Sequence, residues 1–133
     1  MCDSHVLGCG SGRYLHINPS IFKIGSDICL PFLHSASLRG FEVISADNLL
    51  LPFRDGFFDA AISIGVIHHF ASQERRVQAL QELARIVCSG GLLMVYVWAF
   101  EQKYRKASVC LCVKPASCPL GLDVLIYIMC VNI

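Results

Sequence analysis

The chain has 133 residues, of which 55% are hydrophobic and 16% charged, and its formal net charge is +1. This length limits it to one domain, and the near-zero charge excludes nucleic-acid binding through a global positive field. We expect no signal peptide, because no basic segment followed by an apolar run opens the chain. We also expect no membrane anchor, because residues 120–133 are shorter than the roughly 20 residues that a membrane-spanning helix needs.

The apolar and cysteine content also limits the interpretation. The mean hydropathy is positive, so we expect apolar surface to be exposed or to lack a covering element. The eight cysteines contain no Cys-x-x-Cys pair, which gives a zinc site little support. We therefore predict no metal site and reduced thiols that pack as small hydrophobic side chains. This predicts a cytoplasmic protein, with the nucleus as a second location.

Alternating glycines follow the first predicted strand, residues 5–7. Gly8, Gly10 and Gly12 precede a predicted short helix that ends near Asn18. A strand that turns tightly into a helix beside a ligand needs glycine, because a Cβ would block the positive φ and the close approach. An ordinary glycine-rich turn would give the same pattern, so the loop alone indicates little.

An acidic residue follows this loop at an informative distance. A second strand over residues 21–26 leads to Asp27. Nucleotide-binding α/β folds place the acid that bonds ribose hydroxyls about 20 residues beyond the loop. The Gly-x-Gly-x-Gly spacing differs from the dinucleotide fingerprint and favours a cofactor without phosphates, S-adenosylmethionine. Gly8, Gly10, Gly12 and Asp27 are therefore candidate cofactor-binding residues.

Helices and strands alternate along the rest of the chain. The pattern predicts a helix over residues 31–39, a strand over 41–46, a loop over 49–56, a strand over 58–64, a helix over 72–87 capped by Ser72, and a fifth strand over 92–98. This order predicts an α/β fold with a doubly wound, mostly parallel sheet. We expect the sheet to be incomplete after the fifth strand.

Polar residues follow the third and fourth strands. Asp47 and Asn48 can hydrogen-bond an adenine edge, although a turn-forming Asp-Asn pair would look the same. His68 and His69 lie at the carboxyl edge, where open α/β sheets bind ligands. Neighbouring histidines cannot both face one site, so we assign one, His68, as a substrate contact and the other as structural.

Two further observations concern the substrate. Arg75 and Arg76 lie near a helix N-terminus, where they oppose the macrodipole, and we assign them as contacts to a nucleic-acid phosphate. A solvated surface explains them nearly as well.

Residues 63–66 lack the Asp/Asn-Pro-Pro-aromatic tetrapeptide of amine-directed methyltransferases, which favours an oxygen acceptor. Because a carboxylate is already nucleophilic, it needs positioning more than a general base, and no catalytic residue is assigned.

Five segments carry a resemblance to a known family. Residues 8–15, 47–55, 62–70, 74–76 and 96–102 resemble the tRNA methyltransferase 9-like family. The resemblance implies a Rossmann-like class I fold and S-adenosylmethionine-dependent esterification of the carboxymethyl group on wobble uridine of tRNA. It also implies a small zinc-binding activator subunit as a partner.

The chain departs from this family in three places. Val6 stands where the family carries an acid that receives the methionine ammonium, and almost nothing precedes the first strand. The resemblance therefore implies a truncated member, with a partial methyltransferase domain over residues 1–105. Residues 106–133 are predicted to be an unrelated apolar, cysteine-rich tail, in which 108–113 and 124–131 could each form a strand. The alternative function is a catalytically inactive fragment that binds a cofactor or a partner.

Overall fold

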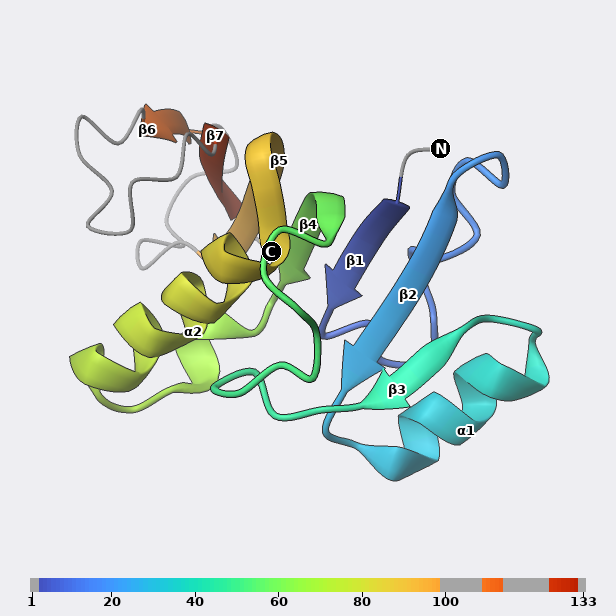
Figure 1. Cartoon of the computed structure of the whole chain (residues 1–133). Coiled ribbons are helices and arrows are strands. Elements are labelled where there is room, and N and C mark those ends of the chain that lie inside the picture. Colours follow the sequence, from blue (N-terminus) through green and yellow to red (C-terminus); the bar gives the residue numbers. More distant parts are fainter. Residues whose placement is uncertain (1–2, 99–108, 114–124, 132–133) are drawn as a thin grey trace.

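The computed structural model describes residues 3–98, 109–113 and 125–131 (Figure 1). Its elements in chain order are β1 (Asp3–Leu7), β2 (Phe22–Asp27), α1 (Leu30–Leu38), β3 (Val43–Ser45), β4 (Phe58–Ile64), the short 3₁₀ helix η1 (Ile67–His69), α2 (Gln73–Ile86), β5 (Val87–Trp98), β6 (Val109–Val113) and β7 (Leu125–Val131). Across these described ranges, no helix combines the length and the apolarity that crossing a bilayer would require.

The strands form one sheet in the order β3-β2-β1-β4-β5-β7-β6 (Figure 1). Every neighbouring pair is parallel except β6 and β7, which are antiparallel. The chain runs outward from β1 to β3, then returns to β4 and runs outward on the other side. This reversal opens a crevice at the carboxyl ends of β1 and β4, where doubly wound sheets bind ligands. The predicted fold class is confirmed.

The two longer helices cover opposite faces of the sheet. Gly25 and Ile62 pair with the same residue of β1 and therefore share a face. On that face, a Cβ at Gly25 would touch Cys9, which packs in a cluster with Leu33 of α1. Ala61 precedes Ile62 and points to the other face, where it packs in the main core with residues of α2.

The sequence of α2 has the features of a helix that packs one face against the sheet. Its buried residues, Ala79, Leu83, Ala84 and Ile86, recur at helical spacing and form one apolar face. The hydroxyl of Ser72 accepts a hydrogen bond from the Arg75 amide at 3.3 Å, which confirms the predicted cap. The helix leads directly into β5, which begins at Val87 rather than at residue 92.

The predicted short helix after the glycine loop is wrong. Hydrogen bonds link Cys9 to Gly12, Gly12 to Leu15 and Tyr14 to Ile17, so residues 10–16 form consecutive turns. Gly10 and Gly12 adopt positive φ values of 51° and 83°, which no right-handed helix contains. So few residues before Pro19 also give too few hydrogen bonds to offset helix nucleation.

The sheet continues beyond the fifth strand. β7 pairs in parallel with β5 from Leu92 to Trp98, and β6 pairs with β7, so both segments predicted as possible strands do form strands. Without β7, the outer edge of β5 would present unpaired N–H and C=O groups, which favour addition of a strand. The β7 sequence, Leu125–Val131, is almost entirely apolar and suits this position. The interpretation of residues 106–133 as a segment unrelated to the domain stays a prediction.

Apolar surface remains exposed, as the hydropathy predicts. Ile28, Leu38 and Leu50 expose 74%, 76% and 77% of their surface. On the α1 face, a groove of about 400 Å³ lies over β4 and β5, with Ile62 and Met94 among its lining residues. α1 contacts only β2 and β3 of the sheet. This half of the face therefore has no helix over it in the described part of the chain.

Candidate functional site

A pocket of about 440 Å³ lies at the carboxyl edge of β1, β2 and β4. The predicted residues that line it are Gly8, Asp27, Asp47 and Asn48, joined by Ile28, Phe32, Ile64, Gly65, Val66, His69 and Phe70. These residues come from segments far apart in the sequence. The parallel sheet brings them together because the carboxyl ends of its strands share one edge.

Asp27 uses both carboxylate oxygens, one on the glycine loop and the other at the start of α1. Oδ2 accepts a hydrogen bond from the Gly10 amide and Oδ1 one from the Cys29 amide, each at 2.9 Å. The carboxylate therefore connects the loop after β1 to the start of α1. Each carboxylate oxygen can accept a second hydrogen bond, so Asp27 can still bond a ligand hydroxyl from its place in the pocket wall.

The three predicted glycines have different roles. A Cβ at Gly8 would overlap Val66 Cγ2, and one at Gly12 would lie 2.7 Å from the Phe41 ring. Gly10 has nothing within 4 Å of its Cβ position. Gly8 lines the pocket and Gly12 does not. Gly12 is therefore needed for packing of the loop against Phe41, whereas Gly10 leaves space beside the loop.

Asp47 and Asn48 form the far wall of the pocket. Asp47 Oδ1 accepts a hydrogen bond from the Leu49 amide at 2.9 Å, so this carboxylate does form the turn that the alternative interpretation expected. Asn48 Oδ1 is buried and has no hydrogen-bond partner within the described ranges. A buried amide oxygen is normally bonded, so Asn48 suits a ligand that brings an amino group, such as adenine.

Of the two histidines, His69 lines the pocket and His68 does not, and the assignment of His68 as a substrate contact stays a prediction. The two rings lie 4.3 Å apart between centroids, and η1 directs them differently. Burial lowers the pKa of His68, and the neighbouring His69 lowers it further. Both effects favour the neutral form of the His68 ring, which does not line the pocket.

Arg75 and Arg76 lie outside the pocket lining. Arg76 Nη1 donates to the carbonyl oxygens of Phe70 and Ala71, at 2.8 and 3.1 Å, and so fixes the segment that enters α2. Arg75 is exposed to solvent. Their assignment as substrate contacts stays a prediction.

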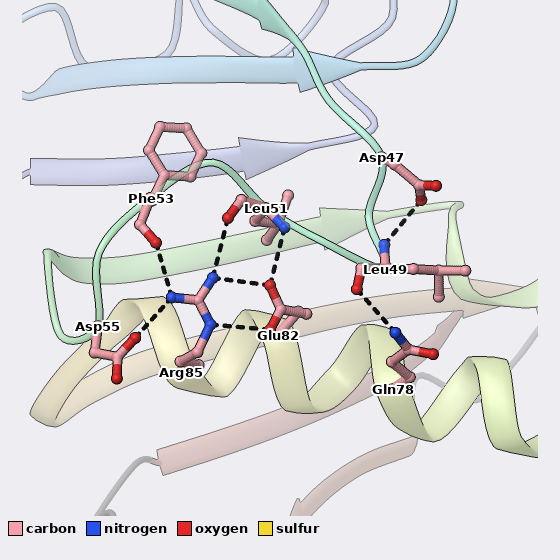
Figure 2. Close-up of polar contacts among 8 residues, drawn as sticks. All are labelled: Asp47, Leu49, Leu51, Phe53, Asp55, Gln78, Glu82 and Arg85. Carbon is pink, nitrogen blue, oxygen red and sulfur yellow. Dashed lines mark hydrogen bonds and ion pairs between the residues drawn. The ribbon is translucent and has the colours of Figure 1, made fainter.

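Sequence reasoning missed the side chains of α2 that hold the pocket wall. Gln78, Glu82 and Arg85 all bond the loop that follows Asn48 (Figure 2). The spacing of 78, 82 and 85 on one helix could have indicated a polar stripe, but its partners are main-chain groups that no sequence pattern reveals. Within the described residues, no group of three or more His, Cys, Asp or Glu could hold a metal ion.

Residues 5–95 match a family model described as a methyltransferase domain. The chain is 55% identical over 100 residues to a mouse protein named probable tRNA methyltransferase 9B, covering 75% of this chain and 22% of that protein. It is 50% identical over 96 residues to an Arabidopsis thaliana tRNA (carboxymethyluridine(34)-5-O)-methyltransferase, covering 72% and 24%. The chain thus spans about a quarter or less of these relatives.

Solved structures show the same fold. A SAM-dependent methyltransferase of Thermotoga maritima, described as a possible histamine N-methyltransferase, is 29% identical with a TM-score of 0.60, over 71% of this chain and 44% of that one. A Haloferax volcanii methyltransferase solved with the Trm112 methyltransferase activator is 26% identical with a TM-score of 0.59, over 68% and 42%. The chain belongs to the methyltransferase domain family, with the tRNA methyltransferase 9-like proteins among its relatives.

Proposed function

We propose that the chain is the cofactor-binding part of an S-adenosylmethionine-dependent tRNA methyltransferase. The observation that carries this proposal is the buried, unpartnered Oδ1 of Asn48 in a pocket that Asp27 also lines. These two residues offer acceptors for the two polar parts of an adenosine, the adenine amino group and the ribose hydroxyls. The relatives named as tRNA methyltransferases support the same class of reaction.

The residues present fit the cofactor at three points. Gly8 exposes loop backbone to the pocket, Asp27 can accept from the ribose, and Asn48 can accept from the adenine. When bound, S-adenosylmethionine supplies an electrophilic methyl group on a sulfonium centre. His69 lines the same pocket, and we propose that it contacts the methyl acceptor.

We propose the carboxymethyl oxygen of wobble uridine as the methyl acceptor. Residues 63–66 carry no motif for clamping an amine, and the Arabidopsis relative is named for carboxymethyluridine. A carboxylate acceptor needs no proton removed, so the chain's contribution is to orient it and exclude water. The apolar lining residues Ile28, Phe32 and Phe70 suit that second task.

We propose tRNA and a zinc-binding activator subunit as partners. The Haloferax neighbour was solved with the Trm112 methyltransferase activator, and the relatives' names specify tRNA. Arg75 is an exposed cation at the start of α2, beside the segment that follows His69, and can meet a phosphate.

The alternative function is a fragment that binds the cofactor without catalysis. Val6 replaces the family acid at the end of β1, which removes a charged partner for the methionine ammonium. Calorimetric titration with S-adenosylmethionine, followed by a methyl-transfer assay on tRNA with and without the activator, separates the two functions. Binding with transfer supports the enzyme, binding without transfer supports the fragment, and no binding by folded protein would overturn both.

A further inference from the structure

The guanidinium of Arg85 is fully used in hydrogen bonding. Nε donates to Glu82 Oε1 at 2.9 Å, Nη1 to the Phe53 carbonyl and Asp55 Oδ1 at 2.7 Å each, and Nη2 to the Leu51 carbonyl at 3.0 Å and Glu82 Oε2 at 2.8 Å (Figure 2). These five bonds account for all five N–H donors of an arginine. The side chain is only 25% exposed, which strengthens each bond relative to one in water.

Two of these five bonds go to backbone carbonyls of one loop, and neighbouring side chains of α2 bond the same loop. Arg85 bonds the carbonyls of Leu51 and Phe53, while Glu82 Oε2 accepts from the Leu51 amide at 2.9 Å. Gln78 Nε2 donates to the Leu49 carbonyl at 3.0 Å. We call Gln78, Glu82 and Arg85 the α2 clamp. Because the clamp bonds main-chain groups, it fixes the path of the loop rather than the side chains on it.

The clamped loop continues directly into the proposed adenine-binding wall. The Leu49 amide bonds the Asp47 side chain, and the Leu50 amide bonds the Asp47 carbonyl at 3.1 Å. Leu49 is therefore held on one side by Asp47 and on the other by Gln78 (Figure 2). Asn48 lies between two fixed points, and its side-chain Oδ1 accepts no hydrogen bond from any described residue.

We propose that the α2 clamp is a positioning device for cofactor binding, in which Arg85 and Glu82 hold the loop so that Asn48 faces the adenine. This inference rests on the proposed function, since it takes the pocket to be the adenosine site. Arg85 touches no pocket-lining residue through these bonds, so it acts through the loop and is not a catalytic residue. Residues that hold a loop in this way keep the binding side chain on it close to the geometry that the ligand needs.

If the α2 clamp served folding alone, its loss would lower the stability of the whole domain. Leu51 is 3% exposed and belongs to the main core, so the loop stays attached to the body of the protein without the clamp. Loss of the clamp then lets the segment around Asn48 move while the core persists. The effect should appear in cofactor affinity and local protection more than in global unfolding.

The test is a double-mutant cycle on S-adenosylmethionine affinity, measured by calorimetry. We expect Arg85→Ala to weaken binding on the order of tenfold, within the range of couplings in a shared network. In the Asn48→Ala background the same change should have little further effect. Arg85→Lys keeps a positive charge beside Glu82, but its ammonium group cannot bond both carbonyls in the way a guanidinium does. We expect this variant to lose less affinity than Arg85→Ala, and it replaces that variant if the alanine substitution unfolds the protein. Gln81→Ala, exposed on the same helix, is the matched control.

Hydrogen exchange of the Leu49, Leu50 and Leu51 amides in the free protein provides a readout without cofactor. We expect faster exchange there in Arg85→Lys, with unchanged exchange in the core strand β4. Wild-type affinity in both Arg85 variants, or losses that simply add to that of Asn48→Ala, would overturn the inference. If the wild-type protein does not bind S-adenosylmethionine, the proposed function is overturned instead. The exchange rates would then still show whether the α2 clamp holds the loop.

Discussion

Asp27 Oδ2 accepts a hydrogen bond from the Gly10 amide at 2.9 Å. The acid expected to bind a ribose is thus also the anchor of the loop on which the cofactor would lie. Its other oxygen holds the Cys29 amide at 2.9 Å, so the carboxylate joins two walls of the pocket before any ligand arrives. Preorganisation of this kind lowers the ordering cost of binding.

The first prediction concerns this anchor. Asp27→Asn replaces one acceptor oxygen with an NH₂ donor, so either the Gly10 or the Cys29 amide loses its partner. An unsatisfied amide costs about 1–3 kcal/mol, and we expect S-adenosylmethionine binding to weaken by at least tenfold in calorimetry. Glu42→Gln is the control, because Glu42 is exposed and does not line the pocket. Equal affinities for wild type and Asp27→Asn would contradict the anchoring role.

The second prediction separates Gly8 from Gly10. Gly8→Ala combines a positive φ of 65° with overlap of Val66, and we expect it to lower the free energy of unfolding by roughly 3 kcal/mol. Gly10→Ala has a φ of 51° and open space around its Cβ, so about 1 kcal/mol is expected. Urea denaturation measures both values. Cofactor affinity, in contrast, should fall in Gly10→Ala, because the methyl group occupies the space beside the loop.

The third prediction concerns pH. Burial, together with the Asp27 charge, raises the pKa of the Cys9 thiol to about 11, against a weaker opposing hydrogen bond. Well below pH 9 the thiol is protonated in both the folded and the unfolded chain, so it does not change stability with pH there. Between pH 9 and 11 it ionises first in the unfolded chain, and stability should fall by about 2 kcal/mol.

The measurement for Cys9 is urea unfolding at pH 8, 9.5 and 11, with Cys9→Ala as the control for other groups that titrate there. The wild-type protein should lose more stability than the variant over that interval. Parallel curves for the two proteins would show that Cys9 titrates normally. A thiol reagent at pH 8 should likewise modify Cys29, which is partly exposed, faster than the buried Cys9.

The fourth prediction restores the family acid. Val6→Asp places a carboxylate at the carboxyl end of β1, where the resemblance implies a partner for the methionine ammonium. A charge-assisted hydrogen bond contributes about 1.5–3 kcal/mol, so cofactor affinity should rise on the order of tenfold. Val6→Asn has nearly the same shape without the charge and should bind as wild type does. An unchanged affinity in Val6→Asp would refute our interpretation of this position.

The sequence by itself determined the order of elements and most of the pocket. Alternating helices and strands predict a parallel sheet, and such a sheet brings the ends of its strands to one edge. Gly8, Asp27, Asp47 and Asn48 are therefore predictable as neighbours, because each ends a strand or follows one within three residues. The capped helix α2 is equally local, since Ser72 and the buried face lie within one continuous segment.

Only the tertiary structure decided which side chains face the pocket and what holds them. The choice of His69 over His68 depends on the single turn of η1, and Gly12 is explained by the Phe41 ring, which is distant in sequence. The α2 clamp joins residues about 30 positions apart through main-chain groups. Such groups are alike in nearly all residues, so the sequence does not reveal which of them will be bonded. The pairing of β7 with β5 likewise spans a long separation. Local patterns determine elements, whereas contacts between distant residues depend on how the complete sheet packs.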